Sequence, residues 1–361
     1  MSETIIMHPR TTTEFVGHHQ AEAELLQAWQ GKRLHHAWMI TGPRGIGKAT
    51  LAYRFARFIL SGGGAGGSTG LFGSADPQNL SVNPTNSASM RVAAGSHPDL
   101  LTIERGVNEK TGKMRGEVVV EDVRGVREFM ALTPAEGGWR IVIVDSADEM
   151  NKAAANALLK ILEEPPPRAL LLLVCHAPGR VLATIRSRCR MLSLTPLAQD
   201  LVEQVLTQTL PDLNAGDRQI LARLSDGSPG RASILAEEEG AELQQKLLQI
   251  IKSLPSLDVA ATYELADRMG KAEGGWSCLE ELFERLVARL LRAAVGADLG
   301  IEAIEGENAL IQKAVSRAQR NSLLDFAEKS LEMMRRADPL NLDRRQTLLQ
   351  IFVAAQAAFK A

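Results

Sequence analysis

Unbroken runs of apolar residues alternate with helical patterns over the first half of the chain. Five such runs are predicted as strands: Ala37–Thr41, Leu100–Ile103, Val118–Val120, Ile141–Asp145 and Leu170–Cys175. Strands that are buried on both faces lack the polar and apolar alternation of a half-exposed sheet. Roughly the first 190 residues are therefore predicted to form an α/β domain around a buried parallel sheet.

The segments between and after these runs have the spacing of helices. Apolar residues recur on one helical face over 51–59, after the first run, and over 158–162, after the fourth. From Gln199 onward the strand pattern ends, and amphipathic helical segments such as Glu280–Ala294 and Leu323–Arg335 follow. The second half of the chain is therefore predicted to be helical.

These patterns divide the chain into three predicted domains, 1–196, 197–240 and 241–361. The first is α/β, and the second and third are helical. Within the first, the stretch of about 61–95 is rich in Gly, Ser, Asn and Ala and too poor in apolar residues to build a core of its own. We predict a flexible insertion there.

Composition excludes several classes of protein. Of the 361 residues 45% are hydrophobic and 23% charged, and no window reaches the roughly 18 apolar residues that suggest a membrane span. The first ten residues lack the features of a secretory signal, so we expect a cytoplasmic protein. Cys175, Cys189 and Cys278 form no CxxC pair, which argues against disulfides and zinc. With a net charge of −2, any contact with nucleic acid must come from a local basic patch or from an assembly with other subunits.

A phosphate-binding loop is predicted between the first strand and the helix after it. The segment Gly42–Ala49 matches GxxxxGK[ST] except at its last position. Backbone N–H groups, the helix N-terminus and the lysine bind phosphate oxygens in such loops, and the residues expected to do so here are Gly42, Gly45, Gly47 and Lys48. A glycine-rich turn with a chance lysine is the alternative.

The position that normally coordinates Mg²⁺ in this loop holds Ala49 instead of Ser or Thr. Thr50 carries a hydroxyl one residue later, about 100° further around the helix. We therefore expect a weakened Mg²⁺ position, while ATP or ADP binding stays open because the glycines and Lys48 are intact.

The apolar strand Ile141–Asp145 ends in a carboxylate, which suits Asp145 to orient a Mg²⁺ shell beside the loop, or alternatively to cap the next helix. ATPases with this arrangement place a glutamate next to the aspartate, but Ser146 stands here. A positioned general base contributes about 10²–10⁴ in rate, so hydrolysis should be slow or absent. We expect Asp148 and Glu149 to form a solvated acidic cluster, the alternative being that one of them replaces the base.

Four further segments occur in a fixed order with these motifs: Leu34–Ala37, Gly95–Asp99, Asn156–Pro166 and Ser187–Cys189. Together they resemble the AAA+ clamp-loader subunits of bacterial DNA polymerase III, from Val16 almost to the end of the chain. The resemblance implies an AAA+ P-loop domain with a parallel sheet, a small helical lid and an all-helical collar that joins a hetero-pentameric ring. It also implies that the complex loads a ring-shaped sliding clamp onto primed DNA.

Arg188 lies in a Ser-Arg-Cys motif, whose arginine in this family reaches the γ-phosphate held by a neighbouring subunit. Such an arginine finger acts in trans; the alternative is an ordinary basic turn over Arg186–Arg190. Glu163 and Glu164 end a predicted helix, where negative charge is unfavourable. We therefore hypothesise that one of them faces a basic group on an adjacent subunit; the alternative is that both are solvated charges at the helix end.

The chain departs from its relatives in three places. The region of a four-cysteine zinc module, Ser61–Ser96, contains no cysteine, so zinc is not predicted. Motor subunits carry a sensor arginine at the position that Gly230 occupies here, and Arg231 lies one position later. At another sensor position, where relatives often have a small polar residue, this chain has Cys175-His176, and we expect His176 to be structural. We predict a subunit without independent ATPase activity, with an ATP-hydrolysing motor subunit as the alternative; a small-molecule kinase is disfavoured by the helical C-terminal half.

Overall fold

The computed structural model describes residues 8–31, 34–63, 77–107, 112, 114–136, 138–271 and 275–360. The chain divides into two compact units. One consists of Met1–Val205 with Gly227–Gly230, and the other of Leu206–Asp226 with Arg231–Ala361. The division falls within two helices, α8 (Gln199–Thr209) and α10 (Pro229–Glu237). The three predicted domain boundaries stay a prediction.

The first unit is built on a five-stranded sheet, and all of its strand pairs are parallel. The strands are β1 (Ala37–Thr41), β2 (Leu100–Glu104), β3 (Arg140–Asp145), β4 (Ala169–Cys175) and β5 (Arg190–Ser193), in the spatial order β2-β3-β4-β1-β5. Every residue of β1 and β4 is buried. The predicted α/β class with a buried parallel sheet is confirmed.

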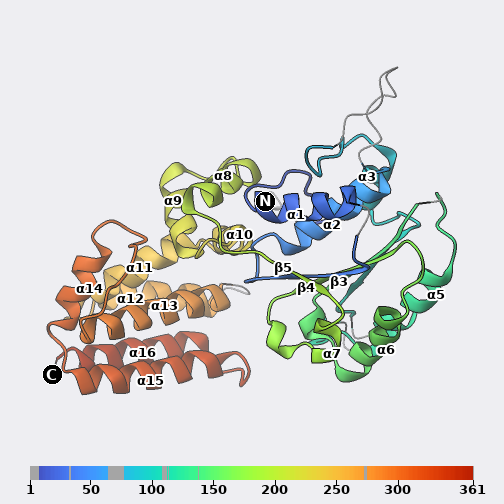
Figure 1. Ribbon diagram of the computed structural model, residues 1–361. Coiled ribbons are helices and arrows are strands. Elements are labelled where there is room, and N and C mark those ends of the chain that lie inside the picture. The colour runs from blue at the N-terminus through green and yellow to red at the C-terminus, as the bar shows by residue number, and fades with distance from the viewer. Residues whose placement is uncertain are drawn as a thin grey trace. The chain divides into compact units, whose positions relative to one another are not determined.

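Helices cover both faces of this sheet (Figure 1). One face carries α1 (His19–Gln30), α2 (Lys48–Leu60) and α3 (Ser87–Ala93), and the other carries α4 (Val120–Arg124), α5 (Val126–Ala131), α6 (Lys152–Glu163) and α7 (Ala183–Arg186). Alternate strand residues face opposite layers, so Trp38 and Ile40 pack with α2, whereas Met39 packs with α6. Because β1, β4 and β3 run parallel to one another, the segments that follow β1 and β3 emerge at the same edge of the sheet.

The predicted strand at Val118–Val120 is wrong. Val118 forms a single bridge with Met150, and α4 begins at Val120. The Asp122 carboxylate accepts a hydrogen bond of 2.9 Å from the N–H of Val119 and so favours a helix start. The pattern also missed β5, an edge strand in which only Leu192 is buried.

Residues 64–76 of the predicted insertion lie outside the described residues. The remainder contains α3, whose N-cap Asn86 accepts hydrogen bonds from two backbone N–H groups. Leu80 and Val92 are fully buried in the core beneath α2. This part of the predicted insertion therefore shares the core of the sheet unit, since it cannot form its own.

The second unit is helical, as predicted. Its helices, besides parts of α8 and α10, are α9 (Ala215–Leu224), α11 (Gly240–Ser253), α12 (Val259–Lys271), α13 (Trp276–Ala294), α14 (Glu307–Val315), α15 (Arg320–Ala337) and α16 (Arg344–Ala358). The two predicted amphipathic segments correspond to α13 and α15. None of the helices in the described part of the chain has the length and apolar character needed to cross a membrane.

Candidate nucleotide site

The predicted phosphate loop lies between the carboxyl end of β1 and the first residue of α2, Lys48. Gly42, Gly45 and Gly47 have φ angles of 142°, 75° and 101°, a region that residues with a side chain rarely adopt. A Cβ atom on Gly42 would lie 2.5 Å from the carbonyl oxygen of Leu194. The loop conformation therefore requires glycine, and it leads directly into a helix N-terminus suited to phosphate.

Lys48 is buried beneath this loop, with 2% of its surface exposed. Its Nζ donates hydrogen bonds to the carbonyl oxygens of Gly42, at 2.7 Å, and Pro43. Burial lowers the pKa of Lys48 to about 8, although the charges of Asp145 and Asp148 oppose the shift. Phosphate oxygens would compete with the loop carbonyls for the same ammonium group.

Asp145 ends β3, and its charge acts on Lys48, so the structure brings these two predicted site residues together. Burial raises the pKa of Asp145, and Glu104 adds to the rise, whereas a hydrogen bond from Ser146 Oγ and the charge of Lys48 oppose it. Thr50 lies half-buried in the first turn of α2. Ala49 adds no hydroxyl, and the described residues contain no group of three or more His, Cys, Asp or Glu side chains that could hold a metal ion.

The position after Asp145 is occupied by a neutral pair of side chains. Ser146 Oγ and His176 Nε2 share a hydrogen bond of 2.8 Å. Burial, together with the charge of Lys48, lowers the pKa of His176 to about 4. The imidazole is therefore uncharged at neutral pH and holds Ser146 in place, in agreement with the structural role predicted for it.

Asp148 and Glu149 do not form the solvated cluster that was predicted. The Asp148 carboxylate accepts hydrogen bonds from the backbone N–H groups of His176, at 2.8 Å, and Ala177, at 3.1 Å. Burial opposes its ionisation, but these hydrogen bonds outweigh burial and hold the pKa of Asp148 below its ordinary value. The prediction failed because these partners lie far along the chain, at the end of β4.

Glu149 has only 11% of its side chain exposed and forms ion pairs with Arg44 and, at 3.1 Å, with Arg105. A general base must have a lone pair within reach of the attacking water. Since both carboxylates past Asp145 are held by other groups, neither is poised as the missing base.

Gly230 packs directly against the phosphate loop. Its N–H donates a hydrogen bond of 2.9 Å to the carbonyl of Gly45, and Ser228 Oγ donates one of 2.9 Å to the carbonyl of Arg44. A Cβ atom on Gly230 would lie 2.9 Å from the Cα of Gly45. The glycine that replaces the expected sensor arginine is therefore required by this contact, which no local sequence pattern had indicated.

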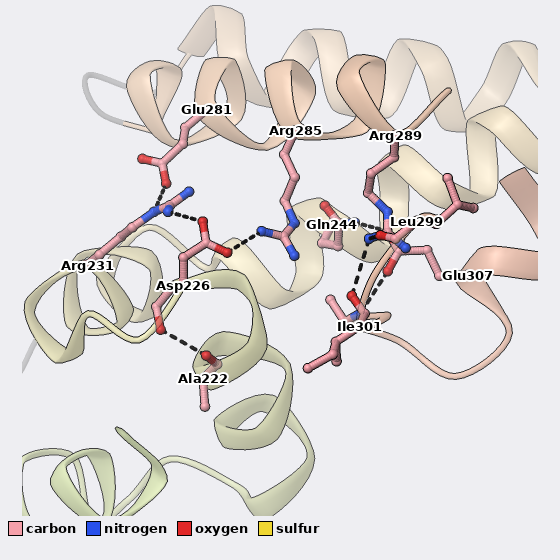
Figure 2. Close-up of polar contacts among 12 residues, drawn as sticks. Ala222, Asp226, Arg231, Gln244, Glu281, Arg285, Arg289, Leu299, Ile301 and Glu307 are labelled. Carbon is pink, nitrogen blue, oxygen red and sulfur yellow. Dashed lines mark hydrogen bonds and ion pairs between the residues drawn. The ribbon is translucent and has the colours of Figure 1, made fainter. Parts of the chain in front are cut away.

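Arg231, the displaced sensor arginine, is part of a polar network within the second unit (Figure 2). It forms ion pairs with Asp226, at 2.6 Å, and Glu281, and Asp226 also pairs with Arg285 at 2.8 Å. These contacts join α10 to α13. Arg231 thus has a structural explanation that does not involve a nucleotide.

Arg188 lies two residues after α7, on the sheet face opposite α2, and is not brought together with the phosphate loop. Its Nη2 pairs with Glu163 Oε1 at 2.9 Å, and its Nη1 donates to the carbonyl of Thr184 at 2.9 Å. Glu163 thus has a basic partner in its own chain, and the hypothesis that Glu163 or Glu164 faces a basic group on another subunit stays a hypothesis. Two glutamates at a helix end indicated that a basic partner was needed, but the sequence alone could not identify Arg188 as that partner.

Comparison with known proteins gives a consistent result. The family model for "DNA polymerase III, delta subunit" matches residues 17–198. The DNA polymerase III subunit delta' of Pseudomonas aeruginosa is 35% identical over 235 residues, 64% of this chain and 65% of that protein. The delta' subunit of Escherichia coli is 32% identical over 240 residues, 65% of each chain. The chain thus matches about 65% of the length of these two relatives.

More distant similarities were also found. The DNA polymerase III subunit tau of Escherichia coli is 27% identical over 292 residues, 79% of this chain and 41% of tau. Among solved structures, a gamma subunit-related protein of DNA polymerase III from Thermotoga maritima aligns over 93% of this chain and 99% of its own, with 19% identity and a TM-score of 0.42. A structural likeness this weak adds nothing to the assignment.

Proposed function

Because the chain belongs to the DNA polymerase III delta subunit family, we propose that it is a delta'-type clamp-loader subunit that does not hydrolyse ATP itself. The observation that carries this proposal is that the two carboxylates past Asp145 are engaged by other groups and that no carboxylate follows Asp145 directly. Asp148 is held by backbone amides, Glu149 by two arginines, and Ser146 takes the place of the catalytic glutamate. The absence of a poised base supports slow or absent hydrolysis.

In the proposed role the subunit contributes Arg188 to the active site of a neighbouring subunit. A guanidinium offers planar, permanently charged N–H donors that match phosphate oxygens. Placed against a γ-phosphate, it would stabilise the charge that develops as the phosphoryl group is transferred. The side chain of Arg188 is 35% exposed, which is consistent with a partner outside the chain.

We further propose that the chain occupies one position of a hetero-pentameric ring, in the cytoplasm, and acts on the sliding clamp and primed DNA only through that ring. We propose that its own phosphate loop can bind ATP or ADP, which the positive φ angles of Gly42, Gly45 and Gly47 support. Phosphate oxygens would then replace the carbonyl oxygens of the loop as partners of Lys48. A bound nucleotide would supply phosphates to this loop without being consumed.

The trans role is tested by reconstituting a loader in which this chain carries Arg188→Ala. DNA-stimulated ATPase activity should fall by about 10³-fold or more, the contribution of an arginine finger in related enzymes. Arg190→Ala is the matched control, because Arg190 is an exposed arginine on the next strand that pairs with Glu24. Full activity in the Arg188→Ala loader would refute the trans role.

The second candidate is an ATP-hydrolysing motor subunit of the gamma or tau type, which the similarity to tau and the intact Lys48 favour. It predicts steady Mg-ATP turnover by the purified chain that Lys48→Ala abolishes. We expect no such turnover. Equilibrium nucleotide binding by the isolated chain and by Lys48→Ala then distinguishes an occupied, silent loop from one that binds nothing.

A further inference from the structure

Arg188 is held at two points by its own chain although much of its side chain is exposed. Nη2 forms an ion pair with Glu163 Oε1, and Nη1 donates a hydrogen bond to the carbonyl oxygen of Thr184, both at 2.9 Å. A free arginine side chain samples many rotamers, and ordering it costs entropy. The two contacts therefore restrict the guanidinium before any partner is present.

Both anchors are fixed by the core beneath them. Glu163 is the last residue of α6, next to Leu162, and Thr184 lies in α7 next to Ile185. Leu162 and Ile185 are buried in the same hydrophobic cluster below the sheet. The backbone at both anchors is therefore held in place, so the Thr184 carbonyl and the Cα of Glu163 keep a fixed separation from which an orientation of the guanidinium can be defined.

The position of Glu163 is unfavourable unless it has a cationic partner. The C-terminus of a helix carries partial negative charge, so a carboxylate in its last turn is destabilising. Arg188 compensates this charge at 2.9 Å. The pair thus explains a glutamate that helix stability alone would disfavour.

Glu163 does not withdraw Arg188 from a partner. The side chains of Glu163 and Arg188 are 49% and 35% exposed, and ion pairs this exposed are weak. Arg188 has five N–H donors in a planar fork, and its one hydrogen bond within the described residues, to Thr184, uses one of them. Further donors therefore remain for phosphate oxygens.

We propose that Glu163 is a positioning residue for the trans-acting arginine: it holds the Arg188 guanidinium in the orientation that meets the nucleotide of the neighbouring subunit. This inference rests on the proposed trans role of Arg188. The residue acts through Arg188 and touches no nucleotide itself.

The test compares Glu163→Gln with Glu164→Gln in a reconstituted loader. Glu164 is exposed at the same helix end, and its side chain forms no ion pair or hydrogen bond within the part of the chain that the structure describes. Glu163→Gln should lower kcat of the DNA-stimulated ATPase by about two- to fivefold, because an exposed ion pair can favour one orientation of the guanidinium by no more than such a factor. KM for Mg-ATP should stay unchanged, because nucleotide binding resides in the neighbour.

A double variant separates positioning from a structural role. If Glu163 acts only through Arg188, Glu163→Gln/Arg188→Ala should be no slower than Arg188→Ala alone. Size-exclusion chromatography of each loader confirms that the compared complexes contain the same subunits. A further loss in the double variant would contradict the proposal.

The remaining outcomes distinguish this inference from the function on which it rests. Loss of activity in Arg188→Ala with normal kcat in Glu163→Gln would overturn the positioning role and leave the trans role intact. Faster turnover in Glu163→Gln would mean that Glu163 restrains the arginine, which also overturns it. An Arg188→Ala loader with full activity would refute both.

Discussion

The phosphate loop and the turn after α7 each contain a cation for which we propose a phosphate partner, but the two cations are held in different ways. Lys48 is 2% exposed, and both of its hydrogen bonds go to carbonyl oxygens of its own loop. The side chain of Arg188 is 35% exposed, and it keeps N–H donors beyond the one that Thr184 uses. One cation belongs to the interior, and the other is available at the surface.

We therefore expect Lys48 and its loop to contribute mainly to the stability of the chain, and Arg188 to contribute mainly to a partner. The base of the loop around Lys48 packs against its own chain, since the N–H of Gly230 binds the carbonyl of Gly45 and Gly42 lies against Leu194, although Pro43 and Arg44 are exposed. Changes there should act first on stability. Changes at Arg188 should act on the assembled complex and leave the free chain folded.

Gly42→Ala should have the largest effect on the stability of the free chain. The new Cβ would lie 2.5 Å from the carbonyl oxygen of Leu194, and the φ of 142° is strained for alanine. We expect a loss of about 2–4 kcal/mol in the free energy of unfolding, measured by urea denaturation. Gly179→Ala is the control, because its Cβ would meet nothing within 4 Å. Equal stability of the two variants would show that the loop is not as tightly enclosed as the comparison requires.

Lys48→Met should change how stability depends on pH. The pKa of Lys48 is lowered from 10.5 to about 8 in the folded chain, so the unfolded chain binds more protons between these values. The contribution of Lys48 to stability therefore rises as pH increases from about 8 to 10.5, and it is least favourable below pH 8. Unfolding free energies of the wild type and Lys48→Met should diverge in this window in favour of the wild type.

Lys152→Met serves as the control for the loss of a lysine, because Lys152 is exposed at the start of α6. A constant difference between the wild type and Lys48→Met from pH 7.5 to 10.5 would contradict a buried, proton-releasing Lys48.

The sequence predicts those parts of the site that depend on neighbouring residues. Gly42 to Lys48 is one continuous turn between a strand and a helix, and Asp145 ends a run of buried apolar residues, so local pattern suffices for both. The short edge strand β5 was missed because three of its four residues are exposed and its position depends on pairing with β1. Strand order is set by the whole chain.

Contacts between distant segments could not be predicted from one sequence. Ser228 and Arg44 are 184 positions apart, and nothing near either residue indicates their hydrogen bond. The same is true of Glu163 and Arg188, whose charges suggest many partners equally well. Asp148 appeared to be a surface acid for this reason, since its backbone partners at the end of β4 belong to another part of the chain.

Arg188→Ala should have the smallest effect on the free energy of unfolding of the free chain. It therefore tests most directly whether Arg188 serves a partner and not the fold. Its pair with Glu163 is exposed on both sides, and such pairs contribute little, so the free energy of unfolding should change by no more than about 0.5 kcal/mol. Arg140→Ala is the contrasting variant, because Arg140 is buried and donates to the carbonyls of Phe129 and Thr133. If Arg188→Ala destabilised the chain as Arg140→Ala does, its loss of loader activity would reflect misfolding, and the arginine could no longer be assigned to a neighbour's active site. A stable Arg188→Ala chain that assembles into an inactive loader is the result that only a surface cation kept for a partner can give.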